Sequence, residues 1–137
     1  ISENINCDIE EIIDLKNRSG AIGYLKAGRD AMRKKETEIS ISDKDPSKYD
    51  CIIIGTPVWA FTMAPAIRTY INQNKNKFKK VAFFCTEGGS GHEKTFKDIG
   101  ELTKKKPIAT MFLFTKEVSK EQHINKTQEF AEKIKES

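Results

Sequence analysis

The chain has 137 residues, with 24 Lys plus Arg against 20 Asp plus Glu, so its net charge is +4. With 37% hydrophobic and 32% charged residues, it has the composition of one globular domain covering residues 1–137, which excludes a disordered chain. No apolar run approaches the roughly 18 residues of a membrane span. The first residues do not resemble a signal peptide, so we expect a cytoplasmic protein without a membrane segment.

The cysteines and the basic clusters look structural. Cys7, Cys51 and Cys85 are odd in number, form no CxxC motif and lie in or beside apolar runs, so we expect buried free thiols and no metal site. The clusters "NKNKFKKV" and "TKKKPI" suit helix C-termini, where cations complement the helix dipole. Because neither a recognised motif nor aromatic interleaving accompanies them, we expect no nucleic-acid partner.

In chain order, the apolar residues predict alternating strands and helices. Residues 7–13 alternate apolar and acidic residues imperfectly, which suggests an edge strand, and residues 22–35 have helical spacing. Three later runs are apolar at successive positions, as in parallel strands covered on both faces: "CIIIG" (51–55), "VAFFCT" (81–86) and "IATMFLFT" (108–115).

Helical spacing follows each of these runs, around Ile67 and Ile71, around Phe96 and Ile99, and from Ile124 to Ile134. Ser119 and Gln122 predict a capping box for the last helix. With right-handed crossovers, this order predicts an α/β fold with an open doubly wound parallel sheet.

Two loops leave the C-terminal ends of neighbouring strands. "TPVWAFTMAP" follows residues 51–55, and "TEGGSGHE" overlaps and follows the end of the 81–86 strand. In such sheets ligands bind at this edge, near the point where strand order reverses. Trp59 offers a flat stacking face, and the glycines allow backbone N–H groups to approach a ligand closely. The two loops therefore predict a site for a planar molecule with polar edges.

The stretches "YDCIIIGTPVWAFTMAPAIRTYI" and "KKVAFFCTEGGSG" resemble the flavodoxin-like family, and the likeness covers essentially the whole chain. The resemblance implies a five-stranded parallel sheet of order 2-1-3-4-5 that binds FMN. It implies a first flavin loop in which Trp59 stacks on the ring and a second loop whose N–H groups bind the ring's pyrimidine end, with no catalytic acid or base. The residues implied are Thr56, Pro57, Val58, Trp59, Ala60 and Phe61 in the first loop, and Cys85, Thr86, Glu87, Gly88, Gly89, Ser90 and Gly91 in the second.

The chain departs from the family at its start. Members begin with a strand and a Thr/Ser- and Gly-rich loop that holds the FMN phosphate at a helix N-terminus, and nothing similar precedes Ile1. We therefore expect strand 1 to be absent between residues 7–13 and 51–55, and FMN to bind weakly or not at all. We expect the gap to be filled by a strand from another copy, by an N-terminal piece, or by residues 7–13 moved inward.

Each candidate also has a structural interpretation. Trp59, Phe61 and Met63 could pack in the core, residues 87–91 could be a plain connection, and Cys85 is more typical of a packing residue than of a redox thiol. Glu87 could be a solvated loop residue, and the two histidines suit surface or capping positions.

Three functions follow from these interpretations. The first is an FMN-dependent redox protein, either an electron carrier or a small oxidoreductase, that serves a redox partner protein or a small-molecule acceptor. The basic net charge weakens the carrier assignment, because the resemblance implies acidic carriers. The second is a flavin-free interaction or regulatory module, and the third is an enzyme of another doubly wound family that binds a nucleotide in the same crevice.

Overall fold

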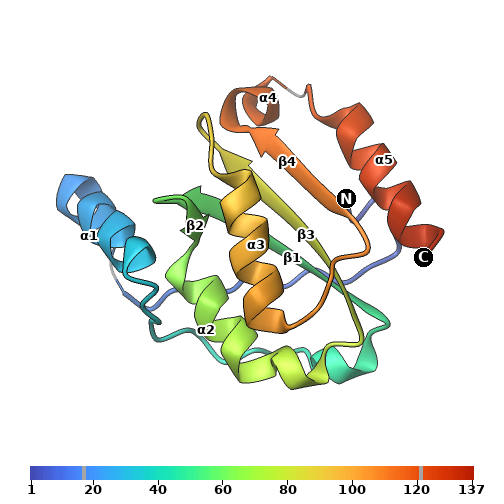
Figure 1. Ribbon diagram of the computed structural model, residues 1–137, viewed down its shortest axis with the longest axis horizontal. Coiled ribbons are helices and arrows are strands. Elements are labelled where there is room, and N and C mark those ends of the chain that lie inside the picture. The colour runs from blue at the N-terminus through green and yellow to red at the C-terminus, as the bar shows by residue number, and fades with distance from the viewer. Residues whose placement is uncertain (17, 121) are drawn as a thin grey trace.

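The computed structural model describes residues 1–16, 18–120 and 122–137. Within these residues the chain forms a mixed four-stranded sheet of order β2-β1-β3-β4 (Figure 1). β1 pairs in parallel with β3, and β3 pairs in parallel with β4, whereas β2 is antiparallel to β1. The strands are β1 (Cys51–Trp59), β2 (Thr62–Met63), β3 (Lys80–Glu87) and β4 (Thr110–Phe114).

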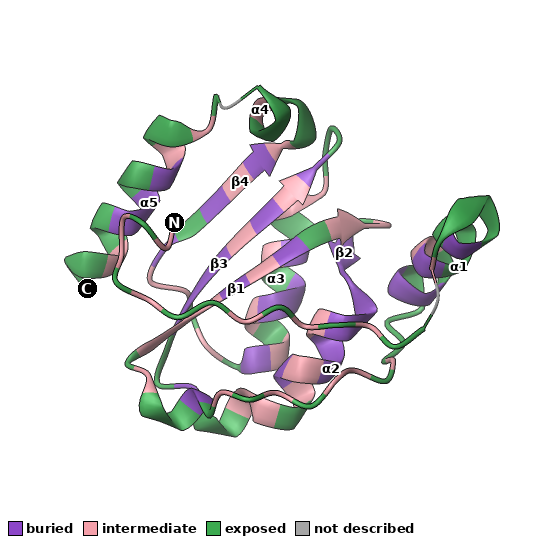
Figure 2. Cartoon of the chain, turned by 180° about the vertical axis from the view of Figure 1, so that it is seen from behind, coloured by how far each residue is buried: buried purple, intermediate pink, exposed green. Residues whose placement is uncertain are grey.

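Helices cover both faces of the sheet, as the doubly wound prediction requires (Figures 1 and 2). Residues of α2 and α3 pack with Ile54, Phe83 and Val81 in one core cluster, while Phe130 of α5 packs with Ala82 and Met111 in the other. The helices are α1 (Gly20–Met32), α2 (Pro65–Asn74), α3 (His92–Thr103), α4 (Thr115–Ser119) and α5 (Ile124–Lys135), with short 3₁₀ turns at Pro46–Lys48 and Lys75–Lys77.

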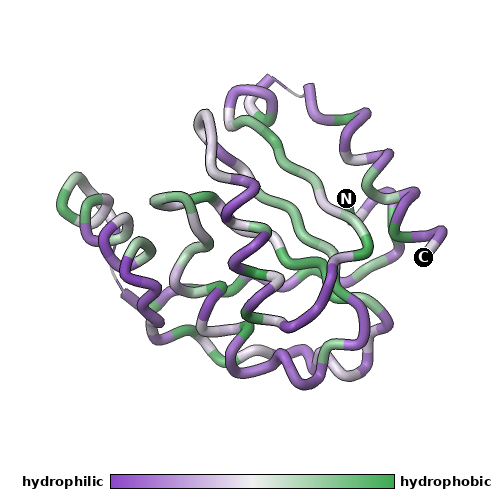
Figure 3. Tube along the Cα trace, viewed as in Figure 1, coloured by the Kyte–Doolittle hydropathy of each residue, from purple (hydrophilic) through white to green (hydrophobic). Residues whose placement is uncertain are grey.

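The three apolar runs all form parallel strands, and α1 forms where helical spacing predicted it. Figure 3 shows why the strands were recognisable, because apolar residues concentrate along them. β1 is longer than predicted, since it continues to Trp59 and turns back through Ala60 and Phe61 into β2. The predicted loop after residue 55 is therefore largely a β-hairpin.

The predicted edge strand at residues 7–13 is wrong. The described residues of this segment join no ladder, and the nearest β-pairing is one isolated bridge between Asp14, just after it, and Ile39. Its acidic side chains are instead engaged by other groups: the Glu10 carboxylate accepts hydrogen bonds from the Ser42 hydroxyl and the Asp43 backbone N–H. Without a strand beside it, the segment is held by side chains, and its alternation does not become β-structure.

The predicted capping box is also wrong. The Ser119 hydroxyl donates to the Lys116 carbonyl within α4, and α5 begins after His123, which makes no side-chain cap. At the start of α4, the Glu117 carboxylate accepts the backbone N–H of Phe114 at 2.7 Å. A short extra helix therefore occupies the position where the pattern indicated a cap.

β1 and β3 are neighbours, yet their burial differs. Val81, Ala82 and Phe83 of β3 are fully buried, whereas Ile52 and Ile53 of β1 are only half-buried. Figure 2 shows this contrast as a mostly purple β3 beside a pink and green β1. β1 is thus the less covered strand, although it contains the apolar run typical of a central strand.

Candidate functional site

The first loop is a tight hairpin tied to the start of α2. The buried Thr56 hydroxyl accepts the backbone N–H of Ala64 at 3.0 Å and donates to the carbonyl of Pro57. Pro65 then opens α2 at the position where a missing N–H costs nothing. The Thr56 side chain therefore closes the hairpin and is not directed at a ligand.

A second tie fixes the hairpin to α3. The Thr62 hydroxyl donates to the Asp98 carboxylate at 2.6 Å, and the same hydroxyl accepts from the Arg68 guanidinium. Burial opposes ionisation of Asp98, but hydrogen bonds from Thr62 and Lys94 outweigh it and lower the pKa of this carboxyl. Sequence reasoning missed Thr62 and Asp98, although an acid beside Thr95 and Ile99 on the buried stripe of α3 was a usable signal.

The turn of the hairpin is conformationally unusual. Ala60 and Phe61 have φ angles of 47° and 62°, and positive φ at both central residues is the pattern of a type I′ turn. Such turns prefer Asn and Gly, because a Cβ at positive φ costs about 1–2 kcal/mol. Strain of this kind concentrates at functional sites, which favours a functional role for this loop. Phe61 is also exposed, with 57% of its surface accessible.

The second loop is closed by a buried carboxylate. Glu87, only 2% exposed, accepts the His92 backbone N–H at 2.8 Å and lies 3.0 Å from the His92 ring nitrogen Nδ1. The His92 ring stacks on Phe112 with 3.7 Å between centroids. The interpretation of Glu87 as a solvated loop residue is therefore wrong. Glu87, which precedes the turn 88–91, binds His92, which follows the turn at the N-terminus of α3.

The two loops meet at the same edge of the sheet. A Cβ added to Gly91, whose φ is 119°, would lie 2.7 Å from Val58 Cγ1 and 3.3 Å from Phe61 Cα. By contrast, a Cβ added to Gly88 or Gly89 would meet nothing within 4 Å. Among the described residues, no hydrogen bond engages the backbone N–H groups of Gly89 and Ser90. The turn, which is exposed at residues 88–90, thus has unused backbone donors beside the hairpin.

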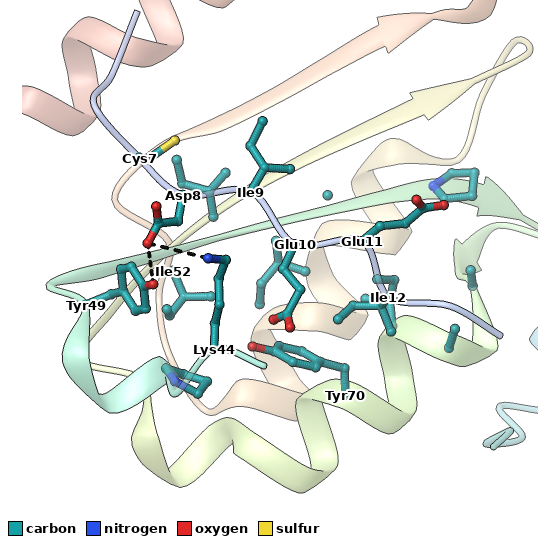
Figure 4. Close-up of a pocket in the computed structure, with 18 of the residues that line it drawn as sticks. Cys7, Asp8, Ile9, Glu10, Glu11, Ile12, Lys44, Tyr49, Ile52 and Tyr70 are labelled. Atoms are coloured by element: carbon teal, nitrogen blue, oxygen red, sulfur yellow. Dashed lines mark hydrogen bonds and ion pairs between the residues drawn. The ribbon is translucent and has the colours of Figure 1, made fainter. Parts of the chain in front are cut away.

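Trp59 lines a cavity of about 570 Å³ that runs along β1 (Figure 4). Gly55 and Pro57 also line this cavity, but no residue of 86–91 does. Residues from both faces of β1 line the cavity, including Ile52 and Ile53, whereas the turn approaches Val58 and Phe61 through Gly91. Trp59 lines this cavity and the turn 86–91 does not, so the structure does not bring the two loops together in one cavity.

The remaining predicted site residues divide between interior and surface. Cys85 is fully buried, and burial followed by the nearby Glu87 charge raises the pKa of its thiol to about 12, which makes it a packing residue. Cys7 and Cys51 are half-buried free thiols and not fully buried as expected. Thr86 is half-buried, Pro57 and Ser90 are exposed, and Ala60 and Trp59 are half-buried.

No helix within the described parts of the chain has the length and apolar character needed to cross a membrane.

Comparisons with known proteins identify a family and solved structures of similar fold. The model of a family described as Flavodoxin matches residues 13–130. Among solved structures, the chain is similar to a flavoprotein from Lactobacillus acidophilus in complex with FMN, at 28% identity and a TM-score of 0.63 over 80% of this chain and 76% of that one. No curated protein matches the chain.

Two further structures are similar in fold. They are proteins described as flavoproteins from Bacteroides eggerthii and Bacteroides uniformis, at 20% and 21% identity and TM-scores of 0.66 and 0.68. Each alignment covers 83% of this chain, and they cover 75% and 78% of the respective partners. At these identities the likeness shows the α/β fold alone.

Proposed function

Because the chain belongs to the flavodoxin family, we propose that it is a redox protein that binds FMN at the C-terminal edge of β1 and β3. The observation that carries the proposal is the meeting of two loops at this edge, where Gly91 approaches Val58 and Phe61. Further support comes from the likeness to a flavoprotein in complex with FMN. When bound, the flavin supplies the redox chemistry, and the protein binds, orients and shields it.

The residues at this edge fit a flavin ring. Trp59 provides an aromatic face, and the unused N–H groups of Gly89 and Ser90 match the acceptor atoms at the polar edge of the ring. Glu87 and His92 hold the turn that carries these donors. In this proposal Thr56 and Cys85 do not contact the flavin: Thr56 fixes the hairpin, and Cys85 packs in the core.

The proposal covers an electron carrier and a small FMN-dependent oxidoreductase alike. A redox partner protein or a small-molecule acceptor receives the electrons. A cytoplasmic setting suits the three free cysteines, because reducing compartments keep thiols unpaired.

Trp59→Ala tests the stacking role. We expect FMN affinity to fall by about 1–3 kcal/mol, by analogy with the loss of an aromatic platform beneath a base. The measurement is a titration followed by quenching of flavin fluorescence. Tyr24→Ala is the matched control, because Tyr24 is a 76% exposed aromatic on α1, outside both loops. Equal affinities for the two variants would remove Trp59 from the site.

The phosphate end of FMN gives a second test. We propose that residues 1–137 hold the ring and leave the phosphate without a dedicated loop, since the Gly- and Ser-rich turn before α3, residues 88–91, is assigned here to the ring. Riboflavin, which lacks the phosphate, should then bind within about threefold of FMN, a difference below ~1 kcal/mol. A preference for FMN of a hundredfold or more would contradict this part of the proposal.

A flavin-free interaction module remains the alternative, and one observation favours it. α1 exposes four large apolar side chains, and exposed apolar patches mark interaction sites. These are Ile22, Tyr24, Leu25 and Met32, each 68–76% accessible. Absence of any flavin binding, by either FMN or riboflavin, would favour this alternative.

A further inference from the structure

One side of α1 packs against the rest of the protein. Gly23, Ala27 and Ala31 are buried on this side, and their spacing of four residues places them in a single row along the helix. The contact is close, because a Cβ added to Gly23 would lie 2.3 Å from the Arg18 backbone. The inner side of α1 is therefore filled by the chain itself.

The outer side of α1 is apolar and exposed. Ile22, Leu25 and Met32, which we call the apolar stripe, lie half a turn away from the buried row and are each 68–71% exposed. Tyr24 lies next to the stripe and is exposed as well. A Cβ added to Gly28 would meet nothing within 4 Å. Because α1 stands at one end of the molecule (Figures 1 and 2), its outer side is open to a large partner surface.

Cations border the apolar stripe on one side. Lys26, Arg29 and Arg33, which we call the cationic edge, lie beside Ile22 at helical spacing, and all three are exposed. The only acid in α1 is Asp30, which is buried and whose carboxylate is paired with cations that precede the helix. The outer side of α1 thus combines apolar and positively charged groups and has no exposed negative charge.

This combination favours an anionic lipid surface over a second copy of the chain. Two copies joined through α1 would bring their cationic edges together, and like charges facing each other are costly. A bilayer interface instead takes apolar side chains between its lipids, while its anionic headgroups attract Lys and Arg. Tyr24 suits the same boundary, because Tyr is enriched where the apolar region of a membrane meets water. A convex helix also needs no matching groove in a fluid surface.

The length of α1 determines how it would lie. Its 13 residues span about 20 Å, whereas the hydrocarbon core of a bilayer is about 30 Å thick. A helix of this kind, apolar on one side and basic beside it, lies in the plane of the interface and does not cross the membrane.

We propose that α1 binds the surface of an anionic lipid bilayer, with its apolar stripe between the lipid chains and its cationic edge at the headgroups. Burial of the stripe provides part of the affinity, and attraction between the cationic edge and the headgroups provides the preference for anionic lipid. The inference rests on exposed side chains of α1 and is independent of flavin binding.

Vesicle binding by the chain of 137 residues tests the proposal. The probe is vesicles of phosphatidylcholine with about 30% phosphatidylserine, and the control is vesicles of phosphatidylcholine alone. In a flotation assay we expect at least about tenfold tighter binding to the anionic vesicles, because the cationic edge meets anionic headgroups only there. Anionic vesicles should also slow hydrogen exchange in α1 and leave exchange in α3 unchanged.

A pair of variants tests the apolar stripe. Leu25→Gln should weaken binding to anionic vesicles by about tenfold, because a large apolar side chain no longer enters the lipid. Ile41→Gln is the matched control, since Ile41 is 92% exposed and lies outside α1, and it should change binding by less than about twofold. Both positions are on the surface, so neither variant is expected to unfold.

A second pair of variants tests the cationic edge. Replacing Lys26 and Arg33 together by Gln should weaken binding to anionic vesicles by about tenfold or more and leave binding to neutral vesicles unchanged. Replacing Lys104 and Lys106 together by Gln is the matched control, because both are exposed, lie beyond α3 and remove the same charge. Retained binding in this control would assign the effect to α1 and not to net charge.

Four results would overturn the proposal. Equal binding to neutral and anionic vesicles would show that the cationic edge takes no part, and so would equal weakening by the two charge variants. Dimerisation that Leu25→Gln abolishes would assign the apolar stripe to a second copy. Absence of binding to anionic vesicles at millimolar lipid would show that α1 does not recognise a bilayer.

Discussion

Gly55 lies opposite Phe84 in the β1–β3 ladder, and an added Cβ there would come within 2.1 Å of the Phe84 ring. The glycine of the "GTPVW" stretch therefore has a packing role that is separate from any ligand. Phe84 in turn meets Phe130 of α5 edge to face, which links this contact to the second core cluster. A motif residue can thus serve the fold and not the site.

Gly55→Ala should destabilise the chain by about 1–3 kcal/mol, because overpacking forces the Phe84 ring or the strand to move. The measurement is urea unfolding followed by circular dichroism. Gly28→Ala in α1 is the matched control, since a Cβ there meets nothing within 4 Å, and it should stabilise by about 0.5–1 kcal/mol. Loss of stability at Gly55 should shrink in a Phe84→Leu background; an undiminished loss would contradict this explanation.

At Ala60 we expect a substitution that increases stability, in contrast to the loss expected at Gly55. Because its φ is 47°, Ala60→Gly should stabilise the hairpin by up to about 1 kcal/mol, since glycine adopts this conformation without strain. Ala66→Gly within α2 should instead destabilise by about 1 kcal/mol or more. Thermal unfolding of both variants measures the contrast, and a loss of stability at both positions would exclude strain at Ala60.

At the scale of elements, the β2–α3 tie makes hairpin stability depend on pH. The folded-state pKa of Asp98 is lowered, because hydrogen bonds from Thr62 and Lys94 outweigh the effect of burial. The unfolded value is about 3.9, so the stabilisation is fully present above that pH and is lost as pH falls through the lower folded-state pKa. The tie is therefore intact at neutral pH and weakens only in acid.

Asp98→Asn should lower stability at pH 7 by about 1–3 kcal/mol, because Thr62 and Lys94 lose a charged acceptor. The gap between wild type and variant should narrow below about pH 4. Urea titrations from pH 2 to pH 7 measure it, and Asp50→Asn is the control, because the Asp50 side chain is fully exposed. A gap that stays constant with pH would contradict a role for the Asp98 charge.

Elements also show what could be predicted from sequence. The three parallel strands were predictable because successive apolar residues suit strands covered on both faces. The hairpin was not, since Ala60 and Phe61 are not the residues that type I′ turns prefer. Residues 7–13 alternate like a strand, but a strand also needs a neighbour, and no single segment specifies its neighbour. The positions of both loops were predictable, whereas the ties from Asp98 and Glu87 depend on contacts between distant segments.

At the scale of the whole molecule, the strands and helices are buried to different extents. α5 and α1 lie at opposite ends (Figure 1), and the apolar residues of α1 are largely exposed. Most residues of β3 are buried, whereas most residues of β1 are only half-buried. The least protected backbone of the core should therefore lie in β1, although it contains the same kind of apolar run as β3.

Hydrogen exchange measured by NMR tests this gradient. We expect the slowest exchange in residues 81–85 and exchange at least about tenfold faster in residues 52–54, because local opening is easier where buried contacts are fewer. Residues 111–113 of β4 serve as the internal comparison, since Met111 and Leu113 are buried at the opposite side of the sheet. Equal protection of β1 and β3 would mean that the lower burial of β1 has no effect on its local opening.

The hydrogen bonds between Glu87 and His92 also affect which substitutions this protein can accept during evolution. Because one buried carboxylate holds the far end of the turn, the fold does not depend on the side chains at positions 88 and 89, where an added Cβ meets nothing and φ lies outside the left-handed region. Substitutions there can alter what the turn recognises at little cost to stability. Selection, or a library randomised at these two positions, can therefore retune recognition while the scaffold stays constant.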